Sequence, residues 1–70
     1  MEVNKVLAEE RFREILKLVE EHKTITVQEL TELLDTSEST IRRDLTTLHK
    51  KGKLIKVHGG ATAVNMAQYT

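Results

Sequence analysis

The segment from residue 37 to residue 50 carries the strongest chemical signal, because basic and hydroxyl side chains recur in it at helical spacing. Since each residue turns a helix by about 100°, Leu45 and Leu48 fall within about 40° of Ile41 and form an apolar stripe. The opposite side gathers cations and hydroxyls without an acid: Ser39, Thr40, Arg42, Arg43, Thr46, Thr47 and Lys50. Arginine can donate two hydrogen bonds to guanine, and hydroxyls reach bases or phosphates. We therefore predict that this side contacts the major groove of double-stranded DNA.

A glycine-rich segment beyond this helix suggests a second contact. Residues 54–57 and 61–64 are β-prone, and the two consecutive glycines between them are typical of a β-hairpin. Glycine lets a backbone approach a phosphate or the minor groove closely. The candidate contacts in and around this hairpin are Lys53, Lys56, His58, Gly59 and Gly60. A Gly-Gly turn alone would indicate no partner, but beside a basic helix it favours a wing that touches DNA.

Two helix starts could also anchor the DNA backbone. Thr26 is followed three residues later by Glu29, which is the spacing of a capping box, and Ser37 can cap a helix over 38–50. The free N–H groups of a first helical turn bind phosphate. Thr26 and Ser37 are therefore candidate backbone anchors, although residues of this kind more often act only as helix caps.

Hydrophobic periodicity predicts the elements that position these residues. Phe12, Ile15, Leu16 and Val19 lie on one side of a first helix, since they recur at i, i+3, i+4 and i+7. The expected order is a helix over 8–22, a strand over 24–26, helices over 27–34 and 38–50, and the hairpin over 54–64. This order predicts a mainly α fold with a small β component: a three-helix winged helix-turn-helix with a C-terminal β-hairpin as its wing.

Single residues indicate how the elements are joined. Asp35 tolerates the left-handed backbone that a tight turn between the second and third helices often needs. Gly52 stands where a left-handed residue is expected after the third helix. Asp44 falls near the buried edge of that helix, so we interpret it as a structural partner for a nearby arginine or lysine and not as a catalytic acid.

Charge is segregated along the sequence, although the formal net charge is zero. Residues 1–35 hold nine acids and five bases, whereas residues 36–70 hold two acids and six bases. A polyanion would respond to the basic half locally, because salt screens exposed charges beyond about 8–10 Å. Chance could produce this asymmetry in so short a chain, so it favours nucleic acid only together with the basic helix.

Several other functions have little support in the sequence. Without cysteine, disulfides and thiolate zinc sites are excluded, and His22, His49 and His58 are not at metal-ligand spacing. No nucleophile elbow or triad pattern is present, so we predict neither an enzyme nor a metal site. No apolar run approaches the roughly 20 residues of a membrane span, and the N-terminus lacks the apolar stretch of a signal peptide. We expect a soluble cytoplasmic protein without membrane contact.

Two separate segments resemble the DeoR-type bacterial transcriptional repressors. They are Thr40-Ile41-Arg42-Arg43-Asp44-Leu45, preceded by Ser37, and Val57-His58-Gly59-Gly60-Ala61. Arg11 and Ile15 also match that family's pattern, and the resemblance spans about residues 8–63. It implies a winged helix-turn-helix domain, with residues 25–44 as its central unit, that reads double-stranded operator DNA sequence-specifically. The sequence departs from the family at Thr36, where valine is frequent, and at Lys56, where arginine is common.

The resemblance also implies features of a longer parent protein. Family members add a C-terminal domain that senses a sugar phosphate, assemble as homo-oligomers and repress genes of carbohydrate uptake or catabolism. No cofactor is expected in the present 70 residues, and residues 65–70 would be a tail or the start of a linker to that domain. Because the helix faces and the hairpin use nearly all apolar residues, we expect the 70-residue chain itself to be monomeric.

Two binding alternatives remain open at this point. Winged helices also serve as protein–protein interaction modules, which often keep the fold and lose the basic face. The lysines and arginines at 42, 43, 50, 53 and 56 argue against that role. RNA binding is the second alternative, but the aromatic residues are Phe12, which we expect to be buried, and Tyr69. They leave no stacking platform for single strands.

Overall fold

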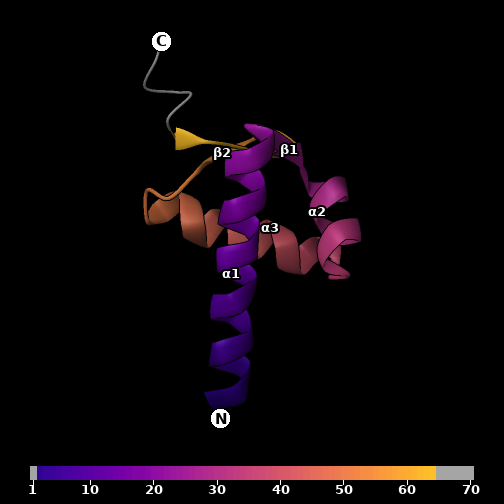
Figure 1. Ribbon diagram of the computed structural model, residues 1–70, viewed down its shortest axis with the longest axis vertical. Coiled ribbons are helices and arrows are strands. Elements are labelled where there is room, and N and C mark those ends of the chain that lie inside the picture. Colours follow the sequence, from indigo (N-terminus) through magenta and orange to yellow (C-terminus); the bar gives the residue numbers. More distant parts are fainter. Residues whose placement is uncertain (1, 65–70) are drawn as a thin grey trace.

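The computed structural model describes the backbone of residues 2–64 and the side chains of residues 8–64. Its elements follow in the order α1 (Glu2–His22), β1 (Thr24–Thr26), α2 (Val27–Leu34), α3 (Glu38–Lys50), β2 (Ile55–Val57) and β3 (Gly60–Thr62). In Figure 1, α3 crosses α1, α2 lies to one side, and the small sheet lies at the end of α1 remote from the N-terminus. The predicted fold class is confirmed, whereas the predicted tail over 65–70 lies outside the described residues.

Most element boundaries agree with those expected from periodicity, and two differ. β1, α2 and α3 have the predicted bounds. α1 begins at Glu2 instead of residue 8, because the prediction took its start from the apolar stripe. Residues 2–7 contain neither glycine nor proline that would stop a helix. The hairpin strands are each one residue shorter than predicted, and the turn is His58-Gly59, because Gly60 already pairs with Val57.

The wing belongs to a three-stranded antiparallel sheet in the order β1-β3-β2. β3 lies in the centre, with Ala61 opposite both Ile25 of β1 and Lys56 of β2. Local patterning does not predict that β1 pairs with β3, because two helices separate these strands in the sequence. The pairing attaches the wing to the strand that leads directly into α2.

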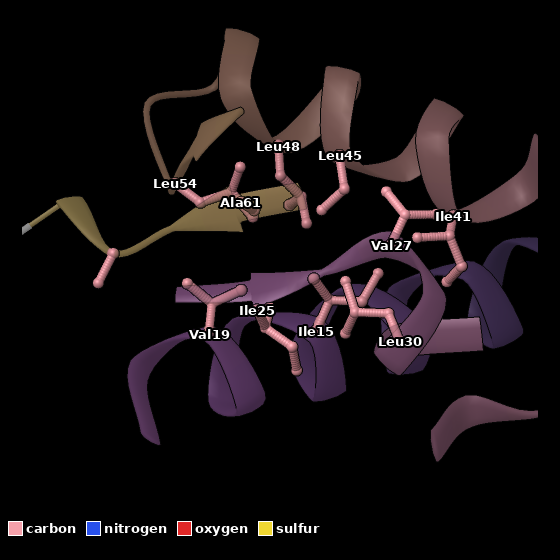
Figure 2. Close-up of a cluster of buried hydrophobic side chains, with 11 residues drawn as sticks. Ile15, Val19, Ile25, Val27, Leu30, Ile41, Leu45, Leu48, Leu54 and Ala61 are labelled. Atoms are coloured by element: carbon pink, nitrogen blue, oxygen red, sulfur yellow. The ribbon is translucent and has the colours of Figure 1, made fainter. Parts of the chain in front are cut away.

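The core lies between α1 and α3, with the sheet and α2 closing it (Figure 2). Its buried side chains are Ile15, Val19, Ile25, Val27, Leu30, Ile41, Leu45, Leu48, Leu54, Ala61 and Ala63. Phe12, Leu16 and Leu34 pack at its margin and are only partly buried. Removing one large aliphatic side chain from water stabilises a fold by about 1.5–3 kcal/mol. The apolar stripes of the three helices therefore meet in one core and leave the opposite side of α3 exposed.

Left-handed residues end α2 and α3 where the sequence analysis placed them. Asp35 has φ 52° and ψ 50°, and its N–H donates to the Thr31 carbonyl. Gly52 has φ 75°, and its N–H donates to the His49 carbonyl at an N–O distance of 3.0 Å. These two positions determine the directions in which the chain enters and leaves α3.

Candidate nucleic-acid interface

α3 has one buried and one exposed side, as its sequence predicts. Ile41, Leu45 and Leu48 on the inner side are at most 2% exposed. On the outer side, Ser39, Arg42, Arg43 and Lys50 are exposed, and Thr40, Thr46 and Thr47 are half-buried at its margins. Among residues 8–64, no ion pair engages Arg43 or Lys50. The outer side therefore presents unpaired cations together with hydroxyl groups.

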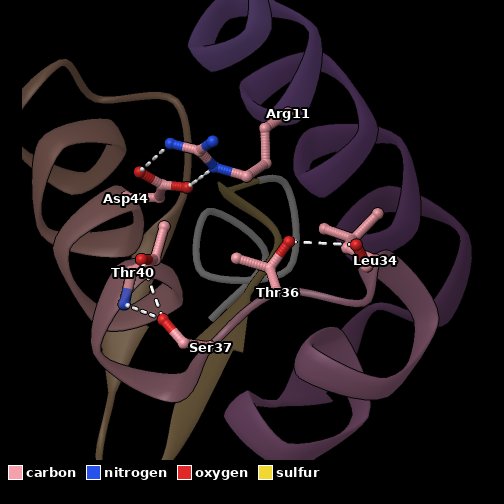
Figure 3. Close-up of polar contacts among 6 residues, drawn as sticks. All are labelled: Arg11, Leu34, Thr36, Ser37, Thr40 and Asp44. Atoms are coloured by element: carbon pink, nitrogen blue, oxygen red, sulfur yellow. Dashed lines mark hydrogen bonds and ion pairs between the residues drawn. The ribbon is translucent and has the colours of Figure 1, made fainter. Parts of the chain in front are cut away.

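Both predicted helix caps are formed. Thr26 Oγ1 accepts the Glu29 N–H at 3.0 Å, and the Glu29 carboxylate accepts the Thr26 N–H at 3.0 Å, which completes a capping box. Ser37 Oγ accepts the Thr40 N–H and donates to Thr40 Oγ1 at 2.9 Å (Figure 3). Both caps therefore have a structural role in starting α2 and α3.

Polar groups close the turn between α2 and α3. The Thr36 N–H donates to the Thr31 carbonyl at 3.1 Å, and the Thr36 hydroxyl donates to the Leu34 carbonyl at 2.9 Å (Figure 3). These bonds satisfy carbonyls that a helix end otherwise leaves unpaired. A valine at this position would lack the hydroxyl bond, so Thr36 replaces apolar packing with a hydrogen bond.

Arg11 of α1 fixes α3 through Asp44 (Figure 3). Nε and Nη2 of Arg11 donate to the two carboxylate oxygens of Asp44, whose side chain is 4% exposed. These hydrogen bonds raise the pKa of Arg11 above its ordinary value, while partial burial of the guanidinium acts in the opposite direction. The two-point contact restricts rotation of α3 about its axis. The interpretation of Asp44 as a structural partner of an arginine is confirmed.

Two hydrogen bonds hold the wing against the helices. Nδ1 of His49, near the end of α3, accepts the Lys56 N–H at 3.1 Å. At the tip of the wing, the Gly59 carbonyl accepts the Val27 N–H at 2.9 Å, where α2 begins. Sequence reasoning missed the His49 contact, because no local pattern marks a side chain that binds the backbone of the following element.

A hollow of about 320 Å³ lies between α3, the wing and the start of α2. Its lining residues are Val27, Arg42, Lys56, Val57, His58, Gly59 and Gly60. It brings Arg42 of α3 together with Lys56 and His58 of the wing. Arg42 Nη2 also pairs with Glu38 Oε2 at 2.5 Å, one helical turn earlier. The expectation that no acid accompanies the outer side of α3 therefore overlooked Glu38.

Two predicted contact residues differ in setting from the rest: Lys53 does not line this hollow, and Gly60 lines it from within the sheet. Lys53 lies beside α1, where it lines shallow depressions with Leu16. Gly60 is buried, and a Cβ at this position would lie 2.3 Å from the carbonyl oxygen of Ile25. The close approach of β1 thus requires a glycine at position 60 for a reason unrelated to DNA.

Two searches of the described part of the chain concern metal-ligand clusters and membrane-spanning helices. Within residues 8–64, no three His, Cys, Asp or Glu side chains lie close enough together to hold a metal ion. No helix within residues 2–64 combines the length and the apolar character needed to cross a bilayer.

Known proteins similar to this chain are transcriptional regulators. The family described as the DeoR-like helix-turn-helix domain matches residues 11–67. The lactose phosphotransferase system repressor of Streptococcus mutans is 49% identical over 61 residues, which are 87% of this chain and 24% of that protein. The HTH-type transcriptional regulator FruR of Bacillus subtilis is 47% identical, and the lactose phosphotransferase system repressor of Staphylococcus aureus 48%. Each of these two matches covers 60 residues, 86% of this chain and 24% of the relative.

The chain thus spans about a quarter of the length of the curated relatives it matches. No solved structure matches the chain.

Proposed function

The chain belongs to the family of DeoR-like helix-turn-helix domains, and from this premise we propose that it reads operator DNA for a transcriptional repressor. In this proposal, α3 enters the major groove, α2 crosses the DNA backbone, and the wing contacts the backbone or the minor groove. Binding to double-stranded DNA is the activity of the domain, and we propose no catalytic role for it.

The contrast between the two sides of α3 carries the proposal. Its inner side is apolar apart from Asp44, whose charge is balanced by Arg11. Its outer side exposes Arg43 and Lys50, which have no ion-pair partner among residues 8–64. Such cations lose no existing ion pair when they bind a phosphate or a base edge. A protein-contact role is not favoured, because the centres of protein interfaces are depleted of charged residues.

We assign base contacts to the middle of the outer side of α3 and backbone contacts to its surroundings. Arg43 is the principal base-reading residue, because a guanidinium can donate two parallel hydrogen bonds to guanine. The proposed set is Ser39, Thr40, Arg42, Arg43, Thr46, Thr47 and Lys50 of α3, Lys56, His58 and Gly59 of the wing, and the helix starts at Thr26 and Ser37. Lys53 is omitted because it lies beside α1, and Gly60 because it is buried against the neighbouring strand β1.

We further propose that the chain is the DNA-reading part of a longer protein, a cytoplasmic homo-oligomer that represses carbohydrate-metabolism genes. The names of the two lactose phosphotransferase system repressors support the class of regulated genes. A sugar phosphate sensed by a separate C-terminal domain is the corresponding proposal for the inducer.

Selection of bound sequences from a pool of random DNA duplexes tests this proposal with the 70-residue chain, used alone or as a tethered dimer. We expect one short sequence to be enriched. Arg43→Ala should then weaken binding to the enriched duplex by about 1–3 kcal/mol and relax the preference at one base pair. Arg13→Ala removes an exposed arginine of α1 and is the control. Failure to enrich any sequence would contradict the proposed function, and equal weakening on a scrambled duplex would reassign Arg43 to a phosphate.

A further inference from the structure

Resting on the proposed function, we propose that the neighbouring arginines of α3 bind different parts of the DNA. Arg42 binds one backbone phosphate in the hollow beside the wing, and this phosphate displaces Glu38 from its guanidinium. Arg43 is then left as the base-reading arginine of the pair. The sequence alone treats the two residues alike.

The two arginines have different surroundings in the structure. Consecutive residues of a helix differ by about 100° in direction, so the side chains at 42 and 43 leave α3 in different directions. Arg42 lines the hollow between α3 and the wing, and Arg43 is not part of its lining. Arg42 therefore faces the wing, whereas Arg43 lies farther round the exposed side of α3.

The lining of the hollow fits an anion. Besides Arg42, its polar side chains are Lys56 and His58, and no acid lines it. A guanidinium and an ammonium group both neutralise phosphate, and a histidine N–H can donate to its oxygens. Because a water molecule takes about 30 Å³ in the liquid, a volume of about 320 Å³ has room for a phosphate group and several waters.

The position of the hollow also favours a phosphate over a base. Base edges are read inside the groove that holds the recognition helix, whereas phosphates lie along the rims of that groove. The wing stands beside α3, and the Gly59 carbonyl ties its tip to the start of α2 through the Val27 N–H. A cation between α3 and this wing therefore meets the rim of the groove.

Without bound DNA, the Glu38 carboxylate pairs with the Arg42 guanidinium. Their side chains are 60% and 61% exposed, and exposed ion pairs of this kind are weak. A DNA phosphate can therefore replace the Glu38 carboxylate on the guanidinium. Glu38 also lies close to the incoming phosphate, which it repels. It should thus weaken binding to every duplex alike, without changing which sequence is preferred.

The experiment compares the duplex enriched by selection with a scrambled duplex at several salt concentrations. A second series of enriched duplexes carries one neutral methylphosphonate in place of one phosphate at a time. The variants are Arg42→Ala, Arg42→Lys, Arg43→Ala and Glu38→Gln, and thermal unfolding verifies that each is folded. Glu21→Gln is the matched control for Glu38→Gln, since it removes the same charge from an exposed position on α1.

Arg42→Ala should weaken binding to both duplexes by the same factor and reduce the slope of log K against log salt by about 0.9. Arg42→Lys should restore the slope, because lysine also neutralises one phosphate. At one methylphosphonate position, the loss of affinity seen with the wild type and with Arg43→Ala should be much smaller with Arg42→Ala, in which only Lys56 still contacts that phosphate. Glu38→Gln should tighten binding to both duplexes by about two- to fivefold, the factor that an exposed ion pair is worth.

Three results would overturn the assignment while leaving the proposed function in place. The first is a lost base preference in Arg42→Ala. The second is a methylphosphonate series in which every position weakens Arg42→Ala as much as the wild type. The third is a Glu38→Gln affinity no higher than that of Glu21→Gln. If the wild type binds neither duplex, the proposed function and this assignment both fail.

Discussion

Arg11 and Asp44 lie 33 residues apart in the sequence and are joined by two hydrogen bonds between α1 and α3. Within residues 8–64, Asp44 is the one charged residue that is buried. A carboxylate is costly to remove from water unless it is paired and hydrogen-bonded. The outward orientation of the basic side of α3 thus depends on a residue of α1 that is remote from the proposed DNA contacts.

Arg11→Ala should therefore lower the free energy of unfolding substantially. The substitution leaves the Asp44 carboxylate buried without its partner, a change that typically costs about 3–5 kcal/mol. We expect the lower end of that range, because the Arg11 side chain is 26% exposed. In a domain of this size each kcal/mol lowers Tm by about 4–8 °C, which thermal unfolding followed by circular dichroism would detect.

Arg42→Ala is the matched control, since it removes an arginine from the exposed pair with Glu38. It should lower the free energy of unfolding by less than about 1 kcal/mol. Equal losses in Arg11→Ala and Arg42→Ala would show that the pair of Arg11 with Asp44 does not stabilise the fold as argued.

The helices could be predicted from the sequence because their signals are local. The capping box of Thr26 with Glu29, the cap at Ser37 and the left-handed turn at Asp35 all depend on residues within four positions of one another. The start of α1 could not be predicted in this way. No start or stop signal marks residues 2–7, so the apolar stripe alone set the expected boundary.

Apart from the arginine partner of Asp44, contacts between elements could not be predicted, because they depend on how the helices and strands pack. The sequence places Lys53 and Lys56 three residues apart, yet the first lies beside α1 and the second beside Arg42.

Glu38 is one turn from Arg42, so helical spacing could have revealed their pair. The prediction divided the residues of α3 into an inner and an outer side. It therefore did not consider Glu38, at the margin of the outer side, as a partner of Arg42.

Gly60→Ala should destabilise the fold more than Gly59→Ala. A Cβ at position 60 would meet the backbone of Ile25, which cannot move away without breaking the pairing of β1 with β3. At position 59 there is no atom within 4 Å, so an alanine there suffers only from the positive φ of 79°, at about 1–2 kcal/mol. Urea unfolding of both variants measures the difference. Equal stability of the two would contradict the close approach of β1 to Gly60.

Lys56→Ala and Lys53→Ala should differ in how salt affects DNA binding. Both remove one positive charge, but only Lys56 lines the hollow with Arg42. Lys56→Ala should reduce the slope of log K against log salt by about one unit, and Lys53→Ala should leave it unchanged. Fluorescence anisotropy of a labelled duplex at four or more salt concentrations gives both slopes. An unchanged slope in Lys56→Ala would mean that the wing lysine makes no phosphate contact, and a reduced slope in Lys53→Ala would mean that Lys53 makes one.

The 70-residue chain should be a monomer in solution. Among residues 8–64, Leu33 of α2 and Val57 of β2 are the exposed large apolar side chains, at 57% and 41%. Two such side chains supply little of the roughly 1,200–2,000 Å² that a stable protein interface buries. Sedimentation equilibrium of the free chain measures its mass directly, and a stable dimer would contradict this prediction.

Such a monomer should bind a single DNA half-site weakly, because one module of this kind buries only about 600–1,000 Å² of protein surface on DNA. Tight binding should require two copies on half-sites one helical turn apart, about 34–36 Å, or a multiple of that distance. Fusion of the chain to an unrelated dimeric scaffold should therefore raise its affinity for paired half-sites by about 10²–10⁴ through effective concentration alone. Titration of the free and the fused chain onto one and two half-sites tests this, with half-sites displaced by half a helical turn as the control. Nanomolar binding of the monomer to one half-site, or no gain on fusion, would show that the domain does not depend on pairing.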